Sequence, residues 1–269
     1  MIPNAFDAAA SRRRCLGYRR RILEISQQVA ALHVAPAFSC LEILDAVYRG
    51  LMRPQDVFVL SKGHGSVAQY VILEDLGVLA RADLDAYCTK TGRLGAHPDY
   101  GVPGISASTG SLGHGMGLAA GMALAERLKG TDARVYAVLS DGECQEGSTW
   151  EAMLMAANLA LGNLVALVDV NDFSGLDRMS EAHPAFHPLP DKARAFGWET
   201  AEVNGHDSGA VVAAVDAGAG AGGKPLFVAC RTVKGKGVAF MENVPIWHYR
   251  SPNKDEYATA LAGLVEIGG

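Results

Sequence analysis

The sequence predicts an open α/β fold, a mostly parallel, doubly wound sheet with helices on both faces, as a single domain over residues 1–269. Short apolar runs alternate with longer segments of helical periodicity, which is the pattern of repeated strand–helix units. The runs lack strict in–out alternation, as is typical of parallel strands buried on both faces. Each run is followed by polar and glycine residues, at the edge where open parallel sheets bind ligands. The predicted strands are 57–60, 135–139, 164–168, 198–203 and 225–230.

The helices are predicted from spacing and capping residues. Residues 5–32 carry apolar residues at helical spacing together with two arginine triplets. A basic targeting segment is an alternative, but a helix with a solvated or subunit-facing basic side is favoured. Pro36 is expected to end this helix, and Ser39 to cap the next one, at 41–48. Further helices are expected at 66–76, 116–129, 146–161, 192–196, 210–217 and 255–265.

Composition and charge exclude several classes of protein. The chain is 49% hydrophobic and 20% charged, with a net charge of −5, which argues against nucleic-acid binding. No apolar run approaches the length of about 20 residues that a membrane-spanning helix needs. The five cysteines form no CxxC pair, so neither a zinc site nor a disulfide framework is indicated. We therefore expect reduced thiols and a cytoplasmic protein without nucleic-acid or membrane partners.

Two neighbouring predicted strands are followed by oxygen-bearing residues. Asp141-Gly142 follows the strand at 135–139, and Asn171 follows the strand at 164–168. A right-handed crossover would bring both ends to one edge of the sheet. A carboxylate, an amide oxygen and a backbone carbonyl near Phe173 suit Mg²⁺, and Gly142 would let the backbone approach a phosphate closely. An ordinary Asp-Gly turn followed by a loop asparagine is the alternative.

Two glycine-containing loops are candidate phosphate-binding segments. Residues 108–115 precede a helix, whose free N–H groups and positive dipole end favour an anion. Lys234 and Lys236 lie between glycines after the last predicted strand. Plain turns and a solvated loop are the alternatives for these two segments. His183 and His187, each before a proline, could bind a metal but are better explained as loop residues.

The motifs resemble those of transketolases, which are thiamine-diphosphate enzymes. Asp141-Gly142, with Asn171 thirty residues later, is similar to the cofactor motif, and DGECQEG with the following WEA is similar to transketolase in particular. LSKGHGS, TGSLGHG and TVKGKGVAFMEN carry the same resemblance, which covers nearly the whole chain. Departures are Ser140 for the family's first glycine, Val34-Ala35 for Pro-Gly, and Tyr249 for a glycine.

The resemblance implies roles for individual residues. Asp141, Asn171 and the Phe173 carbonyl would hold Mg²⁺, for which Ca²⁺ or Mn²⁺ could substitute. Four histidines would face the substrate and the cofactor, and their usual pKa of about 6.5 suits proton transfer in both directions. These candidate catalytic residues are His33, His64, His97 and His248. The residues implied in cofactor binding are His64, Gly110, Ser111, Leu112, Asp141, Gly142, Glu143, Glu146, Asn171 and His248.

The resemblance reaches only the first part of a full-length transketolase. It implies a second chain that carries the pyrimidine and C-terminal domains and supplies the glutamate that activates the cofactor, with two copies of each chain in a heterotetramer. The implied reaction transfers a two-carbon ketol unit from a ketose phosphate to an aldose phosphate. Alternatives are the alpha subunit of a 2-oxoacid dehydrogenase, a fragment of a deoxyxylulose-phosphate synthase, and a non-catalytic regulator that binds thiamine diphosphate.

Overall fold

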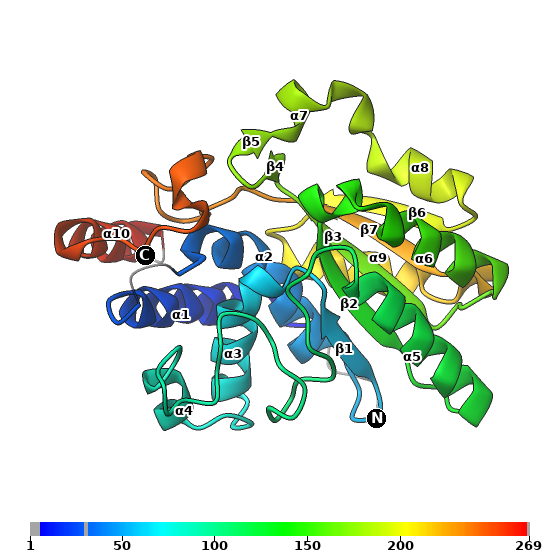
Figure 1. Cartoon of the computed structure of the whole chain (residues 1–269), viewed down its shortest axis with the longest axis horizontal. Helices are drawn as coiled ribbons and strands as arrows, with labels where there is room; N and C mark the ends of the chain where they lie inside the picture. The colour runs from blue at the N-terminus through cyan, green and yellow to red at the C-terminus, as the bar shows by residue number, and fades with distance from the viewer. Residues whose placement is uncertain (1–5, 30–31, 268–269) are drawn as a thin grey trace.

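The computed structural model describes residues 6–29 and 32–267 and contains a parallel sheet with the strand order β1-β2-β3-β7-β6 (Figure 1). Every neighbouring pair in this sheet is parallel, and the register places Ser140 opposite Asp169 and Asp169 opposite Cys230. The predicted fold class is therefore confirmed. The strands are β1 (Val57–Leu60), β2 (Val135–Ser140), β3 (Leu164–Val170), β6 (Glu199–Asn204) and β7 (Leu226–Arg231).

Helices cover both faces of the sheet. One face belongs to a core shared with α1, α2, α3, α9 and α10, in which α10 packs on α1 and α1 packs on α2; the other face belongs to a core shared with α5, α6 and α8 (Figure 1). Successive residues of a strand point to opposite faces, so the wholly apolar runs supply two separate cores. The helices are α1 (Ala8–Ser26), α2 (Val34–Ala46), α3 (Ser66–Asp75), α4 (Arg81–Asp85), α5 (Gly115–Lys129), α6 (Gly147–Asn158), α7 (Met179–Ala182), α8 (Leu189–Ala195), α9 (Ser208–Gly218) and α10 (Lys254–Ile267).

The start of α2 corrects one prediction. The helix begins at Val34 and contains Pro36 in its first turn, where the missing N–H has no helical partner to lose. Ser39 is therefore inside the helix and does not cap it; its hydroxyl contacts the Pro36 carbonyl and the Asp169 carboxylate. The preceding helix, α1, ends at Ser26 rather than near residue 32, and residues 30 and 31 lie outside the described part of the chain.

The segment after β3 contains a short hairpin. Phe173–Ser174 (β4) and Asp177–Arg178 (β5) form a short antiparallel hairpin around Gly175. Asp172 fixes this hairpin, because its carboxylate accepts hydrogen bonds from the backbone and the hydroxyl of Ser180. No helix within residues 6–29 and 32–267 is both long enough and apolar enough to span a membrane.

Candidate active site

The candidate site lies at the carboxyl ends of β1, β2, β3 and β7. A cavity of about 190 Å³ opens there. It contains several of the predicted residues from five different loops, as expected for a ligand site in an open parallel sheet. Its lining residues are Pro36, His64, Gly110, Leu112, Ser140, Gly142, Asn171, Phe173, Ser174, Gly175, Lys234 and His248.

The four predicted histidines come together at this edge. The His33 ring centroid lies 5.7 Å from that of His64, 6.4 Å from that of His97 and 5.5 Å from that of His248. Burial, reinforced by neighbouring cationic groups, lowers the pKa of His33 to about 4 and that of His248 to about 3, and lowers the pKa of His64 well below its usual value. At neutral pH these three rings are therefore neutral, and each offers one donor and one acceptor nitrogen.

The predicted metal ligands also lie together. Asp141 is fully buried, and its carboxylate accepts hydrogen bonds from the backbone N–H groups of Gly142 (2.9 Å) and Asp172 (2.6 Å). Burial and the nearby Asp169 charge raise the pKa of Asp141 to about 7. Within residues 6–29 and 32–267, no cationic side chain forms an ion pair with it. A cation at this position would supply the missing opposite charge.

Gly142 brings two strand ends into close contact. A Cβ atom there would lie 2.9 Å from the Phe173 carbonyl oxygen and 3.0 Å from the Ser174 Cα. The Phe173 carbonyl therefore sits beside the loop that carries Asp141 because residue 142 has no side chain. Asn171 completes this set of oxygens, and its Oδ1 accepts a hydrogen bond from the Phe173 N–H at 3.2 Å.

A buried ion pair orients the Asn171 side chain. Asp169 and Lys62 are both fully buried and form a close ion pair. Burial disfavours both charges, but their mutual attraction outweighs it, so the pKa of Asp169 is lowered and that of Lys62 is raised. Asp169 also accepts a hydrogen bond from Asn171 Nδ2 at 3.1 Å. A carboxylate can only accept, so the amide nitrogen must face Asp169 and the oxygen must face the other way.

The glycine-rich loop is anchored beneath the site. Glu143 accepts hydrogen bonds from the Ser61 hydroxyl and from the Gly113 N–H, the latter at 2.9 Å. A side chain at Gly63 would collide with the backbone of Gly110, so the β1 loop and the glycine-rich loop depend on each other for their positions. Burial raises the pKa of the Glu143 carboxyl, whose oxygens are already used within the protein.

The structure does not bring every predicted residue to the cavity wall. Ser111 and Glu146 are exposed and are not among its lining residues, and Glu146 stands at the N-terminus of α6. Lys234 lies on the cavity wall, whereas Lys236 lies next to Glu242 outside it. The alternation of lysine and glycine made both lysines candidates for phosphate binding, but it could not show which of the two reaches the cavity.

Lys234 links the histidines to the β4–β5 hairpin. Its ammonium group donates to the Gly175 carbonyl at 3.0 Å, lies 2.7 Å from His248 Nδ1 and stands 4.8 Å from the centre of the Phe173 ring. Burial and the charge of Lys62 lower its pKa to about 7. Lys234 is therefore a buried amine on the cavity wall whose charge can change near neutral pH, and its protonated form suits a phosphate ligand.

Comparison with known proteins assigns this arrangement to a family. Residues 50–260 match the family model described as transketolase, thiamine diphosphate binding domain. The chain is 34% identical over 257 residues to a subunit of the apulose-4-phosphate transketolase of Phocaeicola vulgatus, covering 92% of this chain and 91% of that protein. It is also 34% identical to a 6-deoxy-6-sulfo-D-fructose transketolase subunit of Clostridium sp. strain MSTE9, with 93% of this chain and 94% of that protein covered.

Solved structures agree with this assignment. The transketolase from Leishmania mexicana superimposes with a TM-score of 0.87 at 25% identity, over 97% of this chain and 42% of that one. The transketolase from Campylobacter jejuni has the same fold, with a TM-score of 0.87 at 23% identity, over 97% of this chain and 43% of that one. The chain thus spans about two fifths of the length of these solved transketolases. The chain belongs to the transketolase family, as its thiamine-diphosphate-binding domain.

Proposed function

We propose that the chain is the N-terminal subunit of a two-chain transketolase that transfers a two-carbon ketol unit from a ketose phosphate to an aldose phosphate. The proposal rests on the observation that the carboxylates described at this site all have partners within the protein. The oxygens proposed as metal ligands, the histidines and Lys234 gather at one edge of the sheet. Each carboxylate described there already has partners within the protein: Asp141 is bound by backbone N–H groups, Asp169 by Lys62 and Glu143 by Ser61. A second chain would supply the acid that activates the cofactor.

The residues present fit Mg²⁺ and thiamine diphosphate. Asp141, Asn171 and the Phe173 carbonyl form an all-oxygen donor set, which a hard divalent cation prefers, and the buried Asp141 carboxylate lacks a cationic partner among the described side chains. Mg²⁺ is the proposed metal, with Ca²⁺ or Mn²⁺ able to substitute. His64, Gly110, Leu112, Gly142 and Lys234 would surround the cofactor, because they line the cavity beside this donor set.

The protein's own groups would position and polarise the reactants. The bound cofactor supplies an electron sink that allows a carbon–carbon bond next to a carbonyl to break. His33, His64 and His248 would hydrogen-bond substrate hydroxyls as neutral rings, since their lowered pKa values favour this over the proton exchange near pH 6.5 expected from the sequence. His97, next to His33, would extend this surface.

The names of the relatives support a two-chain enzyme. Three similar proteins are named as transketolase subunits, and this chain covers more than nine tenths of each. The proposed assembly contains two copies of each chain. The free cysteines of the chain support a reducing, cytoplasmic environment.

The test is a tagged purification of the chain from its own host, with mass spectrometry of co-purifying proteins. A stoichiometric partner of roughly 300 residues, the size of two further domains, is expected. The reconstituted pair is then assayed on a panel of ketose phosphates with Mg²⁺ and thiamine diphosphate, and light scattering measures its stoichiometry. The variant Asp141→Ala should lose metal-dependent cofactor binding and turnover. Turnover by the lone chain, or unchanged turnover by Asp141→Ala in the pair, would overturn the proposal.

A further inference from the structure

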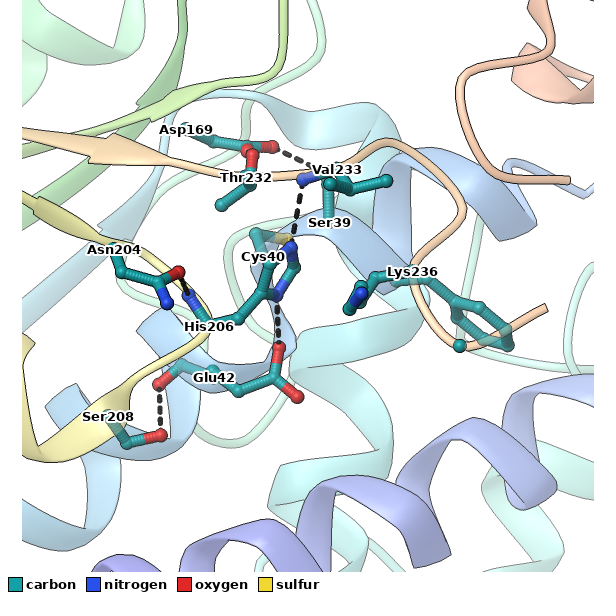
Figure 2. Close-up of polar contacts among 12 residues, drawn as sticks. Ser39, Cys40, Glu42, Asp169, Asn204, His206, Ser208, Thr232, Val233 and Lys236 are labelled. Carbon is teal, nitrogen blue, oxygen red and sulfur yellow. Dashed lines mark hydrogen bonds and ion pairs between the residues drawn. The ribbon is translucent and has the colours of Figure 1, made fainter. Parts of the chain in front are cut away.

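A buried polar chain runs behind the active site and ends at the loop that carries Lys234. His206 follows β6 and stands between α2 and the loop after β7 (Figure 2). Its Nδ1 lies 2.9 Å from Glu42 Oε2, and its Nε2 accepts a hydrogen bond from the Val233 N–H at 2.8 Å. Val233 immediately precedes Lys234, so this contact acts on the backbone next to a residue of the cavity wall.

The two partners of His206 determine its tautomer. A backbone N–H can only donate, so Nε2 must be unprotonated, and the Glu42 carboxylate is an acceptor, so Nδ1 must carry the proton. Glu42 is fixed in turn by Arg19, whose guanidinium nitrogens lie 2.6 Å and 3.0 Å from its two oxygens. Although burial opposes it, Arg19 and His206 lower the pKa of Glu42 to about 2, so the carboxylate is ionised across the neutral range.

The same arginine holds the loop at a second point. Arg19 Nε donates to the Lys236 carbonyl at 2.8 Å, two residues beyond Lys234. Between these anchors, the Gly235 N–H donates to the Ala35 carbonyl at 3.1 Å. The backbone on both sides of Lys234 is therefore tied to α1, α2 and the end of β6.

The end of β6 is built for close contact with this loop. A Cβ at Gly205 would lie 2.5 Å from Thr232 Cγ2, so a side chain there would push the loop away from His206. The Gly205 N–H also donates to the Arg231 carbonyl at 2.7 Å. The approach of His206 to the Val233 N–H depends on this contact between backbones.

We propose that His206 is a positioning residue for Lys234: it accepts the Val233 N–H and, held by Glu42, fixes the loop so that the lysine faces the diphosphate end of the cofactor site. His206 is not on the cavity wall and touches none of the predicted ligands of the cofactor. The proposal rests on the proposed function for what Lys234 binds, but the loop geometry that it describes is independent of that function.

Two substitutions separate the two bonds of the ring. In His206→Gln, the side-chain amide reaches the position of Nε2 and can still accept the Val233 N–H. In His206→Asn, the shorter amide reaches the position of Nδ1, so the donor to Glu42 is kept and the acceptor for Val233 is lost. The exposed His183→Asn is the matched control. In His206→Asn, exchange of the amide hydrogens of residues 233–237 should be about tenfold faster than in the wild type, because a buried N–H loses its partner.

The affinity for diphosphate tests whether the position of the loop that carries Lys234 affects binding at the site. With Mg²⁺ and inorganic diphosphate as the probe, His206→Asn should bind about tenfold more weakly in the reconstituted pair, while His206→Gln and His183→Asn stay within about threefold of the wild type. Equal exchange and equal affinity in His206→Asn and His206→Gln would overturn the proposal. A wild type that binds no diphosphate would instead refute the proposed function and leave the exchange result to decide the role of His206.

A measurement on the wild type covers the case in which His206→Asn fails to fold. In ¹⁵N-histidine-labelled protein, the neutral ring of His206 should be the tautomer with a protonated Nδ1 and an unprotonated Nε2. A neutral ring with its proton on Nε2 would overturn the proposal, because the Val233 N–H would then have no acceptor on the ring.

Discussion

The substitution Gly142→Ala tests the closest contact in the candidate metal site. Its Cβ would lie 2.9 Å from the Phe173 oxygen, and contacts below 3.4 Å are already tighter than most Cβ contacts. One of the two loops must therefore move by about 0.5 Å. The atoms that the new Cβ would meet first belong to the backbone, so no side-chain rotation can relieve the contact. The shift would move the Phe173 carbonyl away from the loop that carries Asp141, because that carbonyl lies against residue 142 of the same loop.

Overpacking of this kind costs about 1–3 kcal/mol of folding free energy. Displacing an oxygen that is proposed to bind the metal should weaken metal-dependent cofactor binding by about 10–100-fold, the range seen when groups that orient metal ligands are altered. The assay is calorimetric titration of the reconstituted pair with thiamine diphosphate at fixed Mg²⁺. The matched control is Gly147→Ala, a nearby glycine at which a Cβ meets nothing within 4 Å.

The expected result is a large loss of affinity in Gly142→Ala and less than a twofold change, about 0.4 kcal/mol, in Gly147→Ala. Circular dichroism should show both variants folded at the assay temperature. Equal dissociation constants for two folded variants would refute the reasoning, because the Phe173 carbonyl would then contribute nothing to the site.

The charges at the site give three further predictions. Asp169→Asn leaves Lys62 as a buried charge without its partner and should lower the free energy of unfolding by about 3–5 kcal/mol in urea titrations; a loss below about 1 kcal/mol would contradict the role of this pair. His33 has a folded pKa of about 4, below the unfolded value of 6.5, so its contribution to stability is complete above pH 6.5 and is lost as the pH falls from 6.5 towards 4. Melting temperatures of the wild type should therefore fall relative to those of His33→Asn over this interval, and parallel profiles would contradict the lowered pKa. Lys234→Met removes the cation beside His248 and should weaken diphosphate binding by about tenfold at pH 7 while leaving the melting temperature within a few degrees; unchanged affinity would show that the lysine does not contact the ligand.

Local patterns were sufficient to predict the strands. The five predicted strands agree with the observed ones within two residues at each end. Four of them are unbroken apolar runs, as expected of parallel strands buried on both faces, whereas β6 is a partly exposed edge strand with a mixed sequence. The positions of Asp141 and Asn171 followed from this, since residues after neighbouring parallel strands must share an edge of the sheet. The histidine cluster required the family resemblance, because its four members come from loops that no spacing rule connects.

Contacts between distant segments could not be predicted. Lys62 and Asp169 are separated by 107 residues, and nothing near either one indicates that it pairs with the other. The order of Pro36 and Ser39 favours a helix cap at the serine, but Pro36 occupies the first turn of α2, where it is tolerated. Glu146 and Ser111 lie in segments that match the family, yet both residues are exposed, and side-chain direction depends on packing that a motif does not specify.

Helix α2 constrains how this enzyme could be altered. All thirteen of its residues are buried, and it runs from the histidine cluster, where His33 precedes it, to the buried Glu42 behind the site. A helix without a solvent face has no position at which a substitution is free of packing effects. Protein engineering aimed at a different sugar should therefore leave α2 intact and vary the exposed loops around residues 100 and 249, whose side chains can change without disturbing the core.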